Sequence, residues 1–175
     1  MADLRGFTRY SDEQELSVVL RDLDRWLEMM VDTVTSANGE VLKFLGDGLL
    51  AMFPVSNGGV DEASAAALRA ARSALNAAAQ ANVGRVAEGR ESYRFAMGLD
   101  AGELAYGNVG GLERLDFTVI GPVVNRASRL VELCKTLEVP LLVSERCAAG
   151  QIPPLQSLGH HELRDVLLPL HVYAP

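Results

Sequence analysis

Two aspartates occupy contexts that suit a site for divalent cations. Asp3 is expected at the end of a short strand, and Asp47 lies in Gly46-Asp47-Gly48 between two apolar runs, which is a hairpin signal. Carboxylate oxygens are the ligands that Mg²⁺ prefers, and two converging carboxylates leave coordination positions open for phosphate oxygens. Taken alone, Asp47 is more readily explained as a turn-forming residue.

Asn125 and Arg129 are four residues apart on a helix predicted over residues 123–137, so both side chains project from one face. An amide and a guanidinium on one face can reach a single polar ligand. On spacing alone, however, Arg129 is better explained as an ordinary surface arginine.

Gly6, Phe7 and Thr8 precede a predicted helix, where backbone N–H groups are placed to bind phosphate oxygens. A glycine before a helix is weak evidence by itself. No Gly-x-x-x-x-Gly-Lys-Ser/Thr pattern is present, which argues against a P-loop enzyme.

The elements that must position these residues alternate between helices and strands along the chain. Helices are predicted over residues 11–36, with Ser11 as the cap, and over 61–81 and 123–137. Strands are predicted over residues 40–45, 49–53, 93–99, 103–109, 117–120, 141–143, 155–163 and 168–173, with 93–99 and 103–109 paired as antiparallel neighbours. The pattern predicts one α+β domain over residues 1–175, with a mainly antiparallel sheet and helices packed on it.

Composition narrows the class of protein. The 175 residues are 49% hydrophobic and 22% charged, as in ordinary globular domains, and the net charge of -7 opposes nucleic-acid binding. No segment is long and apolar enough to span a bilayer, and Asp3 and Arg5 interrupt any signal peptide. Two cysteines outside any CxxC pair and three histidines without zinc-site spacing suggest a cytoplasmic domain whose metal chemistry uses carboxylates.

Taken in order, the motifs resemble the class III nucleotide cyclase catalytic domain, the family of adenylate and guanylate cyclases. Asp3-Leu4-Arg5-Gly6-Phe7-Thr8 resembles the family's Asp-Ile-x-Gly-Phe-Thr, and Lys43 to Asp47 resembles its Lys-x-x-Gly-Asp. Gly121 to Arg129 resembles Gly-Asp-x-Val-Asn-x-Ala-x-Arg. The resemblance covers essentially the whole chain and implies a ferredoxin-like fold.

The resemblance also implies the chemistry. Asp3, Leu4 and Asp47 are expected to form the site for two divalent cations, Mg²⁺ or Mn²⁺. The loop of Gly6, Phe7 and Thr8 is expected to bind the triphosphate. Asn125 is expected to position the ribose, and Arg129 to stabilise charge on the α-phosphate during formation of 3',5'-cyclic AMP and pyrophosphate from ATP.

Recognition of the purine base is assigned by the resemblance to Lys43 and Thr118. A lysine that donates to N1 suits adenine, and a hydroxyl can accept from N6 or donate to the O6 of guanine. Most adenylate cyclases of the family have Asp where Thr118 stands, and threonine resembles the subclass that includes bicarbonate-responsive adenylate cyclases. A guanylate cyclase is the enzymatic alternative.

Three departures from the family pattern are visible. Arg164 stands where many members have a basic residue near the triphosphate, but Asp165 follows it in place of the usual glycine, and Pro122 replaces an aspartate. The first strand is short and apparently truncated, so a longer parent chain with an N-terminal sensor domain is expected. A non-catalytic module for nucleotide binding or dimerisation is therefore a further alternative.

Lys43 and Asp47 would crowd one small hairpin if both served the same ATP. The resemblance implies a head-to-tail homodimer that resolves this crowding. One chain would supply Asp3 and Asp47, and the other Lys43, Thr118, Asn125 and Arg129.

Overall fold

A seven-stranded sheet forms the centre of the molecule in the computed structural model, which describes residues 1–111 and 114–175. The strand order is β2-β3-β1-β4-β7-β9-β8, and the pairings are antiparallel except for the parallel pair β4–β7. The strands are β1 (Ala2–Leu4), β2 (Glu40–Leu45), β3 (Gly48–Met52), β4 (Phe95–Leu99), β7 (Leu141–Ser144), β8 (Gln156–His161) and β9 (Leu170–Ala174). The mainly antiparallel α+β architecture predicted from the sequence is confirmed.

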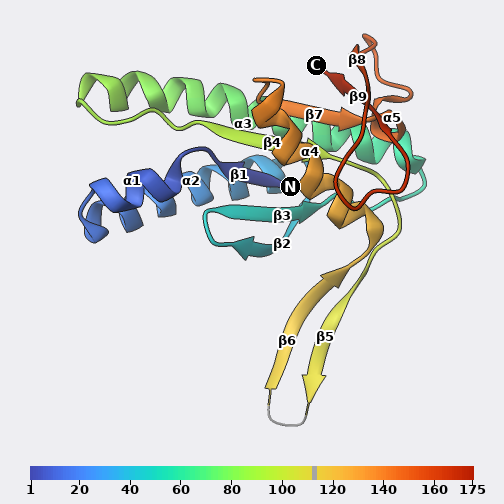
Figure 1. The fold of residues 1–175 in the computed structure, drawn as a ribbon, viewed down its shortest axis with the longest axis horizontal. Helices are drawn as coiled ribbons and strands as arrows, with labels where there is room; N and C mark the ends of the chain where they lie inside the picture. Colours follow the sequence, from blue (N-terminus) through green and yellow to red (C-terminus); the bar gives the residue numbers. More distant parts are fainter. Residues whose placement is uncertain (112–113) are drawn as a thin grey trace.

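Helices cover both faces of this sheet, as Figure 1 shows. The alternation of side chains along β4 explains the two layers, because Phe95 and Met97 face one core and Ala96 faces the other. The first core includes Trp26 of α2 (Leu16–Ser36) and the small residues of α3 (Gly59–Ala87), and the second includes Leu130 of α4 (Pro122–Thr136). The remaining helices are α1 (Phe7–Glu13) and α5 (Glu145–Ala148).

Among the described residues, strands β5 (Ala105–Gly111) and β6 (Arg114–Ile120) pair with each other and with no other strand, and they leave the body as a long two-stranded arm (Figure 1). The predicted pairing of 93–99 with 103–109 is therefore wrong. Strand β4 lies instead between β1 and β7, in the middle of the sheet. Period-two alternation identified the strands but held no information on which partner each one takes.

The predicted helix over residues 11–36 is two helices, because the backbone is extended at Gln14 and Glu15 between α1 and α2. Ser11 lies inside α1, where its hydroxyl donates to the carbonyl of Thr8, so it is not a cap. Leu16, at the start of α2, is exposed and does not join the core. The alanine-rich helix also extends beyond the predicted residue 81, to Ala87.

A buried ionic cluster, the Asp22 cluster, joins α1, α2, α3 and the segment before β4. The Asp22 side chain is 2% exposed and accepts hydrogen bonds from Tyr10 Oη at 2.5 Å, from Arg85 Nη2 at 2.9 Å and from Arg90. Tyr93 Oη donates to the Asp22 carbonyl at 2.9 Å. Burial leaves these charges dependent on one another for compensation.

In the described part of the chain, every helix is too short or too polar to cross a membrane.

Candidate active site

Strand β1 and the β2–β3 turn bring Asp3 and Asp47 together. Asp3 is paired with Gly48, the residue after Asp47, and the N–H of Leu4 donates to the Asp47 carbonyl at 3.3 Å. A Cβ at Gly48 would lie 2.7 Å from the Ala2 carbonyl oxygen and 3.0 Å from Asp3 Oδ1. Only glycine therefore permits the close approach of the two strands, which brings the strand of Asp3 against the turn of Asp47.

The electrostatics of Asp3 show that the two carboxylates share one environment. Burial raises the pKa of the half-buried Asp3 above its usual value, and the negative charge of Asp47 raises it further. Lys135 Nζ of α4, 3.7 Å from Asp3 Oδ2, opposes this shift only in part. Negative charge that lacks full compensation is what a divalent cation neutralises.

The donor set fits a hard cation. Within residues 1–111 and 114–175, no cluster of three or more His, Cys, Asp or Glu side chains exists. Two carboxylates leave coordination positions of a Mg²⁺ ion open for backbone carbonyls, water and substrate phosphates.

Gly6 lies at the start of α1 with a φ of 77°, a left-handed conformation that favours glycine, and Phe7 begins the helix. The guanidinium of Arg94 comes within 4.0 Å of the position that a Gly6 Cβ would take, so a cation lies beside the Gly6-Phe7-Thr8 loop. The sequence analysis did not identify Arg94, because no motif distinguishes it from any other residue that precedes a strand. The N–H of Arg5 donates to the Arg94 carbonyl at 2.7 Å, and this contact depends on sheet pairing.

Lys43 and Thr118 come close to each other although they are far apart in the sequence. Lys43 Nζ donates to the carbonyl of Phe117 at 3.1 Å, directly before Thr118 on β6. Thr118 is half-buried and is paired with Gly107 on β5. The contact joins the β2–β3 hairpin to the arm.

Asn125 and Arg129 lie on α4 as predicted, and Pro122 occupies its first turn after Gly121. Asn125 is exposed, whereas the Arg129 side chain is 18% exposed and has several partners. Its Nε donates to the Arg164 carbonyl at 3.0 Å, its Nη1 to Glu132 at 2.8 Å, and its Nη2 to Asp165 at 3.0 Å. Arg164 therefore lies next to Arg129.

The metal pair and Asn125 belong to opposite ends of α4. Asp3 contacts Lys135, near the carboxyl end of the helix, whereas Asn125 is in its first turn. Ten residues separate Asn125 from Lys135, which is about 15 Å of helix axis. The structure thus brings together Asp3 with Asp47, Lys43 with the backbone beside Thr118, and Arg129 with Arg164, and it keeps the metal pair apart from Asn125 within one chain.

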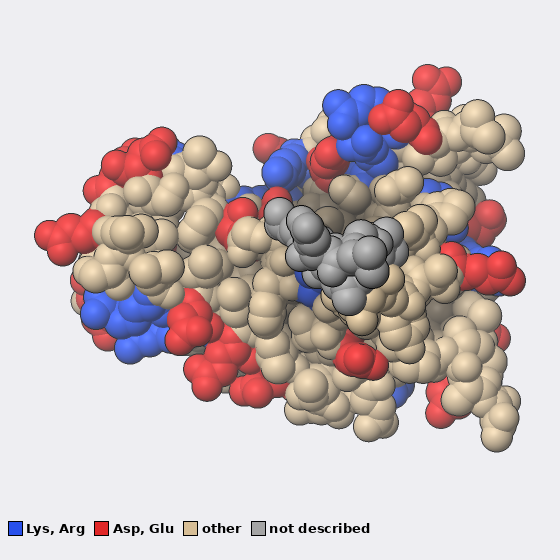
Figure 2. Space-filling model, turned by 90° about the horizontal axis from the view of Figure 1, so that it is seen from below, with Lys and Arg blue, Asp and Glu red and all other residues tan. Residues whose placement is uncertain are grey.

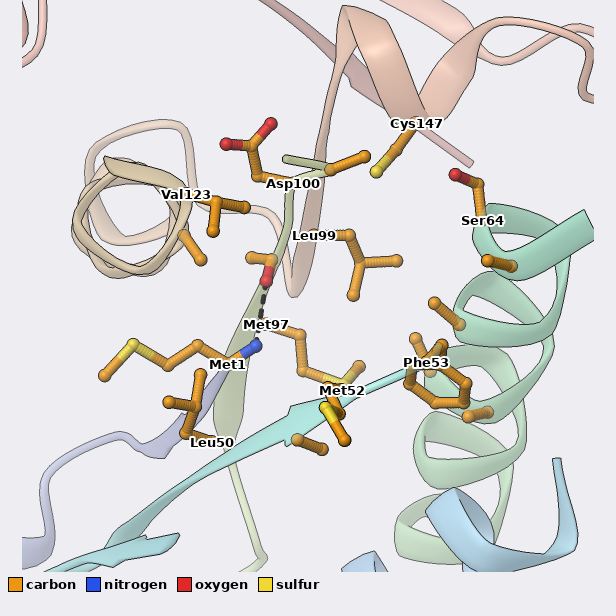
Figure 3. Close-up of a pocket in the computed structure, with 18 of the residues that line it drawn as sticks. Met1, Leu50, Met52, Phe53, Ser64, Met97, Leu99, Asp100, Val123 and Cys147 are labelled. Carbon is orange, nitrogen blue, oxygen red and sulfur yellow. Dashed lines mark hydrogen bonds between the residues drawn. The ribbon is translucent and has the colours of Figure 1, made fainter. Parts of the chain in front are cut away.

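A cavity of about 360 Å³ lies elsewhere, between β3, β4, α3 and the start of α4 (Figure 3). Met1 borders it and donates from its amino group to the Gly98 carbonyl at 3.0 Å. The described residues that line this cavity include none of the predicted site residues, and most are apolar. It is not the site that the motifs point to.

Charged residues are distributed over the surface in mixed groups. On the face in Figure 2, Lys and Arg occur in separate clusters next to Asp and Glu, without a continuous basic stripe.

Known proteins with similar sequences are longer. Uncharacterized proteins from Mycobacterium bovis and Mycobacterium tuberculosis are each 36% identical over 142 residues, which make up 81% of this chain and 25% of each relative. The chain therefore spans about a quarter of the length of the curated relatives that it matches.

Among solved structures, the adenylyl cyclase CyaB from P. aeruginosa has a TM-score of 0.85 and 25% identity, covering 98% of this chain and 89% of that one. The guanylyl cyclase Cya2 shares the fold with a TM-score of 0.80 and 24% identity, over 98% of this chain and 87% of that one. The family model of the adenylate and guanylate cyclase catalytic domain matches residues 1–149. With the paired aspartates of β1 and the β2–β3 turn already in place, this match shows that the chain belongs to the adenylate and guanylate cyclase catalytic domain family.

Proposed function

We propose that the chain is an adenylate cyclase, which converts ATP to 3',5'-cyclic AMP and pyrophosphate with two divalent cations, Mg²⁺ or Mn²⁺. The observation that carries the proposal is the pairing of β1 with β3, which brings Asp3 opposite Gly48 and next to the turn that carries Asp47. Family membership and the donor chemistry of this pair support it.

In this reaction the ribose 3'-hydroxyl loses its proton to water and its oxygen attacks the α-phosphorus, while the bond from that phosphorus to the bridging α–β oxygen breaks and pyrophosphate leaves with this oxygen. Asp3, Asp47 and the backbone at Leu4 would hold the cations, which when bound lower the pKa of the 3'-hydroxyl and offset phosphate charge. Arg129 would stabilise charge on the α-phosphate, an effect typically worth about 10²–10³ in rate. The Gly6-Phe7-Thr8 loop, Arg94 and Arg164 would bind the remaining phosphates.

Adenine is proposed over guanine because Lys43 can donate to N1 and Thr118 can accept from N6. The contact of Lys43 with the Phe117 carbonyl keeps both residues in one region. The similar solved structures include both adenylyl and guanylyl cyclases, so guanylate cyclase activity is the alternative to test.

The site is proposed to be shared by two copies of the chain. About 15 Å of helix axis lie between Asn125 and the residue that contacts Asp3, whereas the 3'-oxygen and the α-phosphate of one nucleotide must meet. The cations on Asp3 and Asp47 of one chain would therefore face Asn125 and Arg129 of the other. The greater length of the mycobacterial relatives supports a longer parent chain, in which we propose an N-terminal sensor domain.

Cyclic nucleotide production by the purified chain tests the proposal, with ATP and GTP in direct competition and with Mg²⁺ or Mn²⁺. Cyclic AMP should be the main product and should be lost in Asp47→Ala. Preferential cyclic GMP would establish the guanylate alternative. Nucleotide binding without either product at high protein concentration would identify a non-catalytic module.

A further inference from the structure

The Asp165 carboxylate lies between the two arginines that the proposed function assigns to phosphate binding. Its Oδ2 is 3.0 Å from Arg129 Nη2 and 3.4 Å from Arg164 Nε. Arg129 Nε also donates to the Arg164 carbonyl at 3.0 Å, which holds the two residues together. One carboxylate oxygen thus receives both guanidinium groups.

The backbone presents Asp165 in an unusual way. Its φ is 62°, in the left-handed region where glycine is favoured and where aspartate and asparagine are the side chains best tolerated. The Asp165 side chain is 76% exposed, so burial does not fix it there. In the part of the chain that the structure describes, the Asp165 carboxylate forms ion pairs with Arg129 and Arg164.

Carboxylates and phosphates accept hydrogen bonds from the same planar set of guanidinium donors. Asp165 Oδ2 therefore occupies a position that a phosphate oxygen could take between Arg129 and Arg164. Most of the other N–H groups of Arg129 are already engaged in hydrogen bonds. Its Nη1 binds both carboxylate oxygens of Glu132, at 2.8 and 3.0 Å, and its Nε binds the Arg164 carbonyl. A polyphosphate that approaches Arg129 therefore meets Asp165 as a competing anion.

We propose that Asp165 competes with the polyphosphate chain of the nucleotide for Arg129 and Arg164, and so weakens nucleotide binding. The identity of the ligand rests on the proposed function. The competition itself rests on the two ion pairs. Because the nucleotide displaces Asp165 when it binds, before the chemical step, removal of the carboxylate should lower KM and leave kcat nearly unchanged.

Calorimetric titration with sodium tripolyphosphate in EDTA tests the competition without any need for catalysis. Asp165→Asn keeps the shape and tolerates the positive φ while removing the charge. It should bind tripolyphosphate about threefold to tenfold more tightly, as expected for two partly exposed ion pairs. Glu138→Asn is the matched control, because Glu138 is also exposed, has a φ of 55°, and forms no ion pair with Arg129 or Arg164 among the described residues.

A second pair of variants assigns the effect to the two arginines. In an Arg129→Gln/Arg164→Gln background, Asp165→Asn should change tripolyphosphate affinity no more than Glu138→Asn does. The proposal is overturned if Asp165→Asn binds no more tightly than the control, or if its gain persists in that background. Weaker binding by Asp165→Asn would also overturn it and would make Asp165 a residue that positions Arg129.

The titration and the activity assay fail independently. Tighter tripolyphosphate binding without cyclic nucleotide formation would leave the competition intact and remove the proposed function. Cyclic nucleotide formation with an unchanged KM in Asp165→Asn would support the proposed function and contradict the competition.

Discussion

Asp3 illustrates how a residue suited to a metal site can be unfavourable for the fold. Its carboxylate is half-buried beside Asp47, and its pKa is raised mainly by burial. The folded chain therefore binds a proton on Asp3 more tightly than the unfolded chain. Stability falls as the pH rises through the interval between the unfolded pKa and the higher folded pKa, and the loss is complete above that interval.

Asp3→Asn should accordingly unfold at a higher temperature than the natural chain at pH 7 in EDTA, and this gain should shrink toward pH 4. The same variant should lose Mn²⁺ binding. Thermal unfolding at both pH values and Mn²⁺ titration check the two effects, with the exposed Asp12→Asn as control. A loss of stability at pH 7 would contradict the electrostatic account of Asp3.

Gly48 governs how closely β1 and β3 approach. Gly48→Ala should destabilise the fold by about 1–3 kcal/mol, because its Cβ would press on the backbone carbonyl of Ala2. Gly84→Ala, in α3 with open space around the added methyl, should instead stabilise by about 0.5–1 kcal/mol. Urea unfolding of the two variants measures the contrast, and equal effects would refute the steric argument.

At the scale of elements, the Asp22 cluster ties α1 and α2 to α3 and to the segment that leads into β4. The same segment carries Arg94 beside the Gly6 loop. Because β1 lies between β3 and β4, the cluster holds the elements on the β4 side of β1, whereas the turn of Asp47 lies on the β3 side. The charges of the cluster are buried, so the loss of one partner leaves another without compensation.

Asp22→Asn should lower the free energy of unfolding by about 3 kcal/mol, because it leaves the guanidinium of Arg85, whose side chain is 8% exposed, without its carboxylate. Asp24→Asn, exposed on the same helix, should change stability by less than about 0.5 kcal/mol. Chemical denaturation of both variants tests this. Similar values for the two would show that the cluster contributes little.

Element positions were more predictable from the sequence than their partners. Periodicity predicted α4 within a residue of its observed ends and set Asn125 and Arg129 on one helix. It could not reveal that β5 and β6 form a separate arm, because hydrogen-bond partners are chosen by the whole sheet. The sequence also did not predict the roles of Arg94 and Lys135 or the ion pairs of Asp165, because these contacts form only through tertiary packing.

At the scale of the whole molecule, the separation of the aspartate pair from Asn125 within one chain allows the proposed shared site to be tested with mixed dimers. Mixed dimers of Asp47→Ala and Asn125→Ala chains have one intact site of two. Because half of randomly formed dimers are mixed, about a quarter of the natural activity should return. Mixtures of Asp3→Ala and Asp47→Ala, whose lesions lie on the same side of the site, should stay inactive. No recovery in the first mixture, with dimers present, would refute the shared site.

Arg5 connects the strand that carries Asp3 to the helix that carries Asn125 and Arg129, although in a shared site these residues would serve different nucleotides. From within the aspartate motif, its Nη2 donates to the carbonyls of Cys134 at 2.8 Å and Val139 at 2.5 Å, at the end of α4. These two hydrogen bonds tie the strand of Asp3 to the end of the helix that carries Asn125 and Arg129 within one chain. In a shared site, the distance between attacking oxygen and α-phosphate then depends on how one subunit is rotated against the other. If the site is shared as proposed, a change in that rotation would alter the rate without any rearrangement within either chain.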